Sequence, residues 1–417
     1  MDINLKNKNS KKLLECRICN SKGIVPILDL GKQPLANSLK KEKTQLESFF
    51  SLEICQCRNC SVIQLTETIN AKLLFNEYVW VTGTSKIAKE YSELFFNRSK
   101  QYLKSKNDFI VEVASNDGTF LKPFKDNGFR VLGVDPATNI AEIANRQGIK
   151  TIPNFFGLQS SKEIVEKEGY ANLIFARNVI PHVENIKDVI SGISNLLSKN
   201  GVGIIEFHRA DIILDELHYD SIYHEHLFYF SIHSLTFLLN SFNLYTFDLD
   251  ISPISGGSFV IYFSKERKIK SNILIKKEKE EINLGVDNLI NWKNFSTKVV
   301  AHKKKIVQIV SEFNEAKKKV IAYGASARSS TLLNFCEFSY KDLEVIADKS
   351  AMKQGLFTPG TEIPIVSPED ALRNDPDVIL LLAWNFKDEI IEELKKKYNW
   401  KGKLILPLPY EPKVIDI

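Results

Sequence analysis

The sequence has no long apolar run and no excess of charge of either sign. Its 417 residues carry a formal net charge of +5, and lysine and glutamate are interleaved, as at 276–281. Such mixing is typical of solvated surface and does not indicate nucleic-acid binding. Residues 1–12 lack the apolar core of a signal peptide, and the apolar run at 378–384 is far too short to cross a bilayer. We therefore expect a cytoplasmic protein without a membrane or nucleic-acid partner.

Cysteine is scarce beyond residue 60, where a single one occurs. Four of the others form two Cys-x-x-Cys pairs, Cys16 with Cys19 and Cys57 with Cys60. In a cytoplasmic chain such pairs favour a metal over disulfides. Four thiolates at about 2.3 Å close a tetrahedral zinc site and leave no open position, so we expect structural zinc. Reduced thiols without a metal are the alternative, and Cys55 is expected to be a strand residue outside the site.

The sequence also lacks the Gly-x-Gly-x-x-Gly loop of a dinucleotide-binding fold. The strand expected at 109–114 leads into a loop where Ala114 and Asn116 replace the first two glycines. A pyrophosphate favours glycine there because it needs close approach of the backbone. Glu112 and Asp117 would instead repel phosphate and suit a cationic ligand, such as S-adenosylmethionine with its sulfonium and ammonium groups. An ordinary turn with solvated acids is the alternative.

A second expected strand supports a nucleoside site. It covers 131–134 and ends on Asp135, seventeen residues beyond Gly118. In doubly wound folds an acid at this place accepts hydrogen bonds from a ribose. The predicted cofactor contacts from this region are Glu112, Ala114, Asn116, Asp117, Gly118 and Asp135.

Alternating strand and helix patterns predict an α/β chain with two Rossmann-like domains. Expected strands are 109–114, 131–135, 151–152, 171–176 and 202–207, with helices from 119, at 137–147 and at 186–197. Strands near 245–251 and 259–263 follow without a helix between them, so we expect an antiparallel pair. Five parallel strands closed by such a pair resemble the common class I methyltransferase fold, although a fold alone is weak evidence for function.

The last part of the chain repeats this organisation after a charged helical stretch at 268–318. Expected strands are 320–323, 343–347, 378–383 and finally 404–406, with helices at 330–336, 367–372 and 387–397. The turn at Gly324 to Ala327 and the following helix N-terminus could hold a phosphate. A purely structural docking domain is the alternative.

A polar cluster lies between the fifth strand and the antiparallel pair. Three of the chain's seven histidines fall at 218–226, just after the carboxyl end of a strand, where open α/β sheets bind ligands. An imidazole takes up a proton near neutrality, Glu225 can orient and charge-stabilise it, and Tyr223 can hydrogen-bond a developing oxyanion. His182 follows the fourth strand and approaches the same edge. We predict catalysis at this cluster.

Two other interpretations of the cluster remain open. His224 and His226 are two residues apart, so on an extended segment they would share a face and could bind a metal. No further carboxylate–histidine spacing supports a catalytic metal, however. They could also be hydrogen-bonded histidines of the core or surface.

These segments together resemble the nucleotide-sugar C-methyltransferases of deoxysugar biosynthesis. The resemblance runs from about Cys16 to Pro409 and includes the cysteine pairs, the cofactor loop and 178–185. The most specific matches are Ile222-Tyr223-His224-Glu225-His226, Gly256-Gly257-Ser258, Tyr323-Gly324-Ala325, Thr331-Leu332-Leu333-Asn334, Lys353-Gln354-Gly355, Pro359-Gly360 and Ala383-Trp384-Asn385. Many short matches in the same order are far more specific than any single one.

The resemblance implies three domains and assigns roles to residues. A zinc-binding domain (1–75), a methyltransferase domain (76–267) and a nucleotide-anchoring domain (319–417) are expected, with a helical connector at 268–318. Tyr223, Glu225, His226 and His182 would surround the reacting carbon, with His226 as the base. The resemblance also implies further contacts: Asn178 to the cofactor, and Tyr78, His224, Gly324, Ser326, Arg328 and Ser329 to the substrate. Members of this family usually have a lysine and a small residue at the positions of Arg328 and Ser329. Arginine keeps the charge but not the geometry of lysine, so this departure concerns the nucleotide or sugar preference.

The predicted function is therefore methyl transfer from S-adenosylmethionine to a ring carbon, C3, of a nucleotide-linked 4-keto-6-deoxy sugar. The expected products are branched deoxysugars of surface polysaccharides or glycosides, made by a monomer. The alternatives are an O- or N-methyltransferase on such a sugar, a nicotinamide-linked oxidoreductase that uses the C-terminal turn, and a non-catalytic zinc scaffold.

Overall fold

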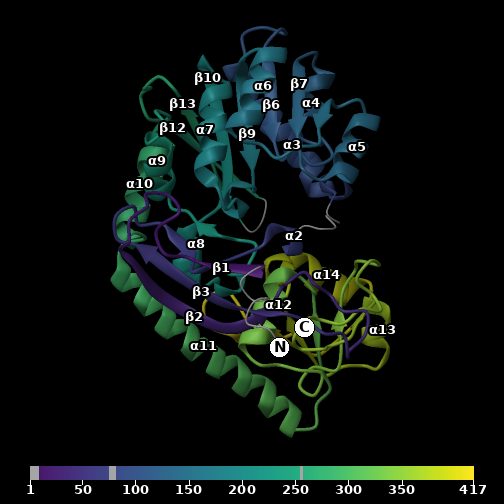
Figure 1. The fold of residues 1–417 in the computed structure, drawn as a ribbon. Coiled ribbons are helices and arrows are strands. Elements are labelled where there is room, and N and C mark those ends of the chain that lie inside the picture. Colours follow the sequence, from purple (N-terminus) through teal and green to yellow (C-terminus); the bar gives the residue numbers. More distant parts are fainter. Residues whose placement is uncertain (1–8, 75–80, 254–256) are drawn as a thin grey trace.

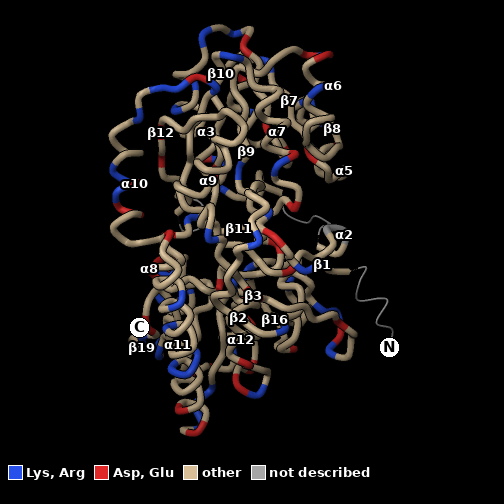
Figure 2. The backbone as a smooth tube through the Cα atoms, turned by 60° about the vertical axis from the view of Figure 1, so that its left-hand side comes forward, with Lys and Arg blue, Asp and Glu red and all other residues tan. Residues whose placement is uncertain are grey.

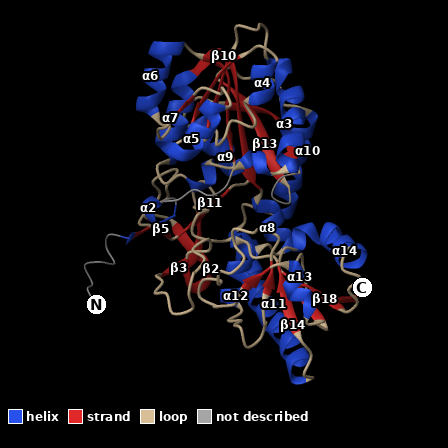
Figure 3. Ribbon diagram, turned by 90° about the vertical axis from the view of Figure 1, so that its right-hand side faces the viewer, coloured by secondary structure: helices blue, strands red, loops and turns tan. Residues whose placement is uncertain are grey.

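A computed structural model describes residues 9–74, 81–253 and 257–417. Figure 1 shows the largest sheet at the top and the N-terminal and C-terminal units below it. In both larger units helices flank the sheet (Figure 3). One buried cluster contains side chains of all three units, among them Leu52, Ile205 and Leu332. No helix within the described ranges is long and apolar enough to cross a membrane.

The largest sheet has seven strands in the order β12-β13-β10-β9-β6-β7-β8. Its strands are β6 (Phe109–Val113), β7 (Arg130–Val134), β8 (Thr151–Ile152), β9 (Ala171–Arg177), β10 (Leu197–His208), β12 (Tyr245–Ser252) and β13 (Ser258–Ser264). The five from β6 to β10 pair in parallel, whereas β13 is antiparallel to both β10 and β12. This confirms the expected layout. All five residues of β6 are buried because helices cover both faces of a parallel sheet.

Helices precede and connect these strands. They are α3 (Lys86–Ser99), α4 (Lys122–Asp126), α5 (Thr138–Arg146), α6 (Leu158–Glu168), α7 (Ile186–Leu196), α8 (Ala210–Glu216) and α9 (Ile232–Asn240). The helix expected from Thr119 begins only at Lys122, so that expectation was wrong by one turn. Asp117 explains the delay, because its Oδ1 accepts from the Thr119 amide at 3.2 Å and hydroxyl at 2.7 Å. This local turn competes with the helix.

The N-terminal sheet is completed by residues from the middle of the chain. Its order is β11-β4-β3-β2, with β2 (Ile24–Pro34), β3 (Phe49–Cys57), β4 (Ile63–Leu65) and β11 (Phe228–Tyr229). Phe228 pairs with Gln64 and Tyr229 with Ile63, antiparallel. A two-stranded sheet of β1 (Ser10–Lys12) and β5 (Glu67–Ile69) lies beside it. The segment that follows the polar cluster is therefore fixed by the zinc-held unit.

The C-terminal sheet has the order β16-β15-β14-β17-β18-β19. Its strands are β14 (Val320–Tyr323), β15 (Ile346–Ala347), β16 (Ile365–Val366), β17 (Val378–Leu381), β18 (Lys403–Leu406) and β19 (Lys413–Asp416), and its helices are α12 (Ala327–Phe335), α13 (Pro368–Arg373) and α14 (Lys387–Lys396). We expected the last strand at 404–406, which was wrong, since β19 pairs antiparallel with β18. This edge strand has no buried residue, so apolar alternation could not reveal it.

Two helices connect the larger units, as expected: α10 (Asn272–Leu284) and α11 (Leu289–Glu315). Gly285, with φ of 68°, ends α10 in the left-handed conformation that favours glycine. Blue and red segments both occur along α10, so the mixed charge lies on one helix (Figure 2). The buried positions of α11, from Trp292 to Val310, recur every three or four residues, as on one helix face.

Lys40 joins the N-terminal and C-terminal units. Its side chain is 3% exposed, and its Nζ lies 3.3 Å from Glu47 and 3.0 Å from Glu362. Its backbone exchanges two hydrogen bonds with Phe357, while both oxygens of Glu47 accept from the amide of Gly360. A buried cation held by two acids fixes the two units together.

We expect Lys40→Ala to destabilise the protein by about 2–3 kcal/mol. Removal of one partner leaves acids without their cation, and the loss stays below that of a fully buried pair because Glu362 is 39% exposed. Urea unfolding measures the change, with the exposed neighbour Lys41→Ala as the matched control. Equal stability of both variants would show that the Lys40 ion pairs add nothing.

Candidate active site and metal centre

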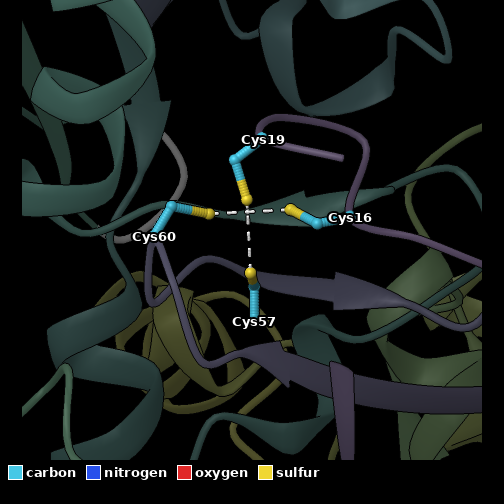
Figure 4. Close-up of side chains that lie close together, drawn as sticks. All are labelled: Cys16, Cys19, Cys57 and Cys60. Atoms are coloured by element: carbon cyan, nitrogen blue, oxygen red, sulfur yellow. Dashed lines mark hydrogen bonds between the residues drawn. The ribbon is translucent and has the colours of Figure 1, made fainter. Parts of the chain in front are cut away.

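The four cysteines of the two pairs converge on one point (Figure 4). The Sγ atoms of Cys16 and Cys60 are 3.6 Å apart and those of Cys19 and Cys57 are 3.5 Å apart; all four lie within 4.8 Å of one another. Four sulfurs at about 2.3 Å from a tetrahedral zinc lie about 3.8 Å from one another. The thiols therefore fit a structural zinc ion, and the hydrogen bond with Cys60 lowers the pKa of Cys16 to about 5.

Cys55 lies outside this cluster, as the sequence indicated. It belongs to β3, and its thiol donates to the carbonyl of Gln64 at 3.5 Å. Burial raises its pKa to about 12, so it stays protonated. Within the described residues, the four-cysteine cluster is the one group of three or more side chains arranged to hold a metal. The metal suggested for His224 and His226 gains no support.

We expect purified protein to contain about one zinc per chain. Cys19→Ser should lower the zinc content well below that value and lower the melting temperature, because it removes one thiolate ligand. Cys55→Ser is the matched control, since it changes a cysteine that lies close by but outside the cluster. Plasma mass spectrometry measures the metal. Full zinc content in Cys19→Ser would contradict the assignment of that ligand.

The cofactor loop after β6 is held in a strained, closed form. Ala114 and Asn116 have φ of 52° and 50°, and Gly118 has φ of 79°. A Cβ at Gly118 would lie 2.8 Å from Ile149, so this position requires glycine. The amide of Asn116 donates to Asp135 at 2.8 Å, which joins the loop to the end of β7. Burial raises the pKa of Asp135.

A second partner of the loop was missed from the sequence. The Asn116 side-chain oxygen accepts from the amide of Thr82 at 2.8 Å, and Asp117 accepts from Gly83 at 2.9 Å. A Cβ at Gly83 would lie 2.5 Å from the Asp117 carboxylate. The available sequence signal for this contact was Gly83, which follows an aromatic stretch. No local pattern links Gly83 to a loop more than thirty residues further along the chain.

Glu112 is the strongest indication of a cationic ligand. It is 3% exposed, and its Oε2 has no hydrogen-bond partner within the described chain. Arg177 is close, but its Nε already donates to Glu206 at 2.8 Å. Burial raises the pKa of Glu112 well above its usual range, and the positive charge of Arg177 offsets only part of this rise. An unpaired buried carboxylate is costly, so a cation bound here would be favoured. This fits the positive charges of S-adenosylmethionine.

Asn178 lies at the same edge of the sheet as the cofactor loop. It follows β9, has φ of 49°, and its amide donates to the carbonyl of Glu206 at 2.9 Å. This turn lies beside the strand that carries Glu112, because β6 and β9 are paired. Its assignment to the cofactor stays a prediction.

We expect Glu112→Gln to weaken S-adenosylmethionine binding by about tenfold to a hundredfold, the value of one hydrogen bond to a charged group. In the unchanged protein the cation prefers ionised Glu112. Affinity should therefore fall as the pH falls through the raised pKa of Glu112, and Glu112→Gln should lose this dependence. Calorimetric titration measures both, with the exposed Glu93→Gln as control. An unchanged dissociation constant in Glu112→Gln would reject the role.

The histidine cluster forms a turn rather than an extended segment. The amide of His226 donates to the carbonyl of Tyr223 at 3.0 Å, which closes the turn. The alternative in which an extended segment puts His224 and His226 on one face therefore does not apply. His224 is buried and lies edge-on to Phe50 of β3, with ring centroids 6.0 Å apart. Burial lowers the pKa of His224 to about 4. Its predicted contact with substrate gains no support from this position.

His226 has a defined tautomer. Its Nδ1 lies 3.2 Å from the carbonyl of Ser221, which can only accept, so Nδ1 carries the proton. Its Nε2 lies 2.8 Å from the hydroxyl of Tyr223 and therefore accepts a hydrogen bond. Burial, together with the neighbouring His182, lowers the pKa of His226 well below 6.5. The imidazole is thus neutral, with its lone pair on Nε2.

His182 and Glu225 complete the cluster in different ways. The rings of His182 and His226 are 4.8 Å apart, edge to face, and burial lowers the pKa of His182 to about 4. We expected Glu225 to contact the imidazole of His226. Within the described chain, the Glu225 carboxylate instead contacts Asn37 of the N-terminal unit. The side-chain amide of Asn37 donates a hydrogen bond to Oε1 of Glu225 at 2.6 Å. Burial raises the pKa of Glu225.

Arg328 brings the C-terminal unit to this cluster. Its Nε donates to the hydroxyl of Ser221 at 3.0 Å, and its guanidinium lies 3.8 Å from Asp220 and over the ring of Trp384. Trp384 in turn donates to Asp220 at 2.8 Å. Thus Arg328 is placed at the junction of the two larger units, on the residues next to Tyr223.

Gly324, Ser326 and Ser329 have structural tasks in the turn before α12. Gly324 has φ of 98°, and a Cβ there would lie 2.4 Å from that of Ala383. The hydroxyl of Ser326 caps α12, and buried Ser329 donates to the carbonyl of Gly324 at 2.7 Å. The carboxylate of Asp348 accepts a hydrogen bond from the amide of Ala325 at 2.8 Å. A carboxylate therefore lies at the turn that was predicted to hold a phosphate. Ser326 is exposed, and its contact with substrate stays a prediction.

Tyr78, predicted to line the substrate site, lies outside the described residues. The residues that sequence reasoning missed are Asn37, Thr82 and Gly83. Each makes its contact with a residue from a distant part of the chain, so no local pattern could reveal it.

Comparison with known proteins identifies the parts of the chain. Three family descriptions match consecutive parts of the chain: a zinc binding domain at 16–75, a methyltransferase domain at 84–248 and a C-methyltransferase C-terminal domain at 253–409. The sheet order, the acidic cofactor loop and the four thiols define a zinc-binding, S-adenosylmethionine-dependent methyltransferase.

The relatives define the class more closely. C-methyltransferase NovU of Streptomyces niveus is 32% identical over 408 residues, which cover 96% of this chain and 97% of NovU. The chain belongs to this C-methyltransferase family. Ubiquinone biosynthesis O-methyltransferase of Rickettsia typhi is 27% identical over 96 residues, 23% of this chain and 39% of that protein. A solved methyltransferase of Anabaena variabilis is 15% identical, covering 47% of this chain and 91% of its own, with a TM-score of 0.36.

Proposed function

We propose that this C-methyltransferase acts on C3 of a nucleotide-linked 4-keto-6-deoxy sugar, with His226 as the base. The observation that carries the proposal is the neutral His226 imidazole, whose Nε2 lone pair is bound to a tyrosine hydroxyl. A carbon becomes a nucleophile when a neighbouring carbonyl allows loss of its proton. A C-methyltransferase on a sugar therefore needs a base and an adjacent ketone. S-adenosylmethionine, when bound, supplies an electrophilic methyl group.

His226 takes the proton in this proposal. The C3–H bond breaks, its proton moves to Nε2, and its electron pair forms an enolate with the 4-keto oxygen. Nε2 is suited to this step because Nδ1 is already protonated and bound to the Ser221 carbonyl. Burial that lowers the pKa of His226 keeps it in the accepting form at neutral pH.

Tyr223 supports the enolate. Its hydroxyl now donates to Nε2 at 2.8 Å, so substrate must replace the imidazole as its acceptor. The same hydroxyl then donates to the oxygen on which negative charge develops. His182, 4.8 Å from His226 between ring centroids, is the second candidate for this oxygen.

The C-terminal unit would anchor the nucleotide. Arg328 is the one charged residue among the predicted contacts there, and it reaches the segment that carries Tyr223. A guanidinium matches the paired oxygens of a phosphate. In this division residues 1–75 hold zinc, 76–267 bind the cofactor, 268–318 connect, and 319–417 anchor the nucleotide.

We expect His226→Gln to lower turnover by about 10²- to 10⁴-fold, the usual loss of a general base. Cofactor binding should persist, because His226 lies outside the cofactor loop. Mass spectrometry of products from a panel of nucleotide-linked 4-keto sugars measures turnover. Nuclear magnetic resonance in heavy water measures exchange of the C3 proton, which should occur with the unchanged protein and vanish in the variant.

The exposed His233→Gln is the matched control and should behave as the unchanged protein. Undiminished turnover in His226→Gln would reject the base. A methylated product that forms without any loss of a ring proton would instead indicate transfer to oxygen or nitrogen.

A further inference from the structure

The zinc-held unit contributes a polar side chain that contacts Glu225 of the histidine cluster. Asn37 follows β2, and its Nδ2 donates to Oε1 of Glu225 at 2.6 Å. Glu225 precedes His226 in the turn that the Tyr223 carbonyl closes. A residue from the first part of the chain thus holds the carboxylate of the residue that precedes the predicted base.

The loop that carries Asn37 is fixed at both ends. Before it, Pro34 at the end of β2 is paired with Phe49 of β3. After it, Lys40 exchanges two backbone hydrogen bonds with Phe357 and holds the ion pairs described above. Within the loop, the amide of Ser38 donates to the carbonyl of Leu35 at 3.0 Å. Asn37 is therefore held in position although its own side chain is exposed.

An amide is a suitable partner for this carboxylate. It donates without carrying a charge, so the donor itself does not titrate. Burial raises the pKa of Glu225, and the hydrogen bond from Asn37 opposes that shift because it favours the ionised form. The ionisable neighbours His182 and His226 are neutral near pH 7 because burial lowers the pKa of each.

We propose that Asn37 is a positioning residue for methyl transfer, which acts by holding the side chain of Glu225, the residue before His226 in the turn, ionised and in one orientation. The zinc-held unit then takes part in the reaction as well as in folding. This inference rests on the proposed function for its effect on turnover, but not for its effect on Glu225.

A double-mutant cycle tests whether Asn37 acts through Glu225. Asn37→Ala should lower kcat by about tenfold or more, the value of a hydrogen bond to a charged group, with little change in KM. In a Glu225→Gln background the same substitution should have no further effect. Independent, multiplying effects of the two substitutions would overturn the proposal, as would an unchanged kcat in Asn37→Ala.

Two further variants separate the donor from the shape of the side chain. Asn37→Asp keeps the size but replaces the donating amide with a second carboxylate, so it should lower kcat at least as much as Asn37→Ala. Ser38→Ala changes the exposed neighbour and should leave kcat unchanged. Zinc content and melting temperature, equal in all of these variants, would show that the fold is retained. Full activity in Asn37→Asp would overturn the proposal.

An infrared measurement needs no sugar. The carboxyl stretch of protonated Glu225, assigned by its loss in Glu225→Gln, should appear at higher pH in Asn37→Ala than in the unchanged protein. If no keto sugar is methylated by the unchanged protein, the proposed function fails, while this measurement still decides whether Asn37 controls Glu225. An identical titration in both proteins would overturn the inference.

Discussion

The segment at 218–230 is the constraint on which the site depends, because it contacts all three units. The hydroxyl of Thr331 in α12 donates to the carbonyl of Ile222, and the amide of Leu65 in the N-terminal unit donates to Leu227. Between these two anchors the chain has little freedom. The turn that carries Tyr223 and His226 is thereby held without regular secondary structure, which suits a site that must be rigid before substrate arrives.

Burial has opposite effects on the acids and the histidines of the site. It raises the pKa of Glu112 and Glu225 and lowers that of His182 and His226, since each neutral form is favoured in an apolar setting. The acids are therefore costly to keep ionised, whereas the histidines are neutral near pH 7. At Glu112, a bound cationic cofactor would stabilise the ionised carboxylate. At Glu225, the neutral amide of Asn37 stabilises it through a hydrogen bond.

Local patterns predicted what local forces determine. The cysteine pairs, the loop after β6 and the succession of strands in the largest sheet follow from spacing, apolar runs and turn residues over a few positions, and the structure agrees with them. The same reasoning placed the start of α4 too early, because it did not include the turn made by Asp117. It also left open an extended segment at 224–226, which the turn closed by the Tyr223 carbonyl excludes. Contacts such as Asn37 with Glu225 join distant residues, and a single sequence contains no signal for them.

The pairing of β11 with β4 has a consequence for synthesis on the ribosome. The cysteine pairs are complete once residue 60 has been made, so metal capture can come early. The last strand of the same sheet, however, exists only after residue 229 has been translated. Until then the edge of β4 is unpaired, and such an edge invites association with other nascent chains. Early metal capture therefore leaves a partly folded N-terminus that must wait for more than half of the polypeptide.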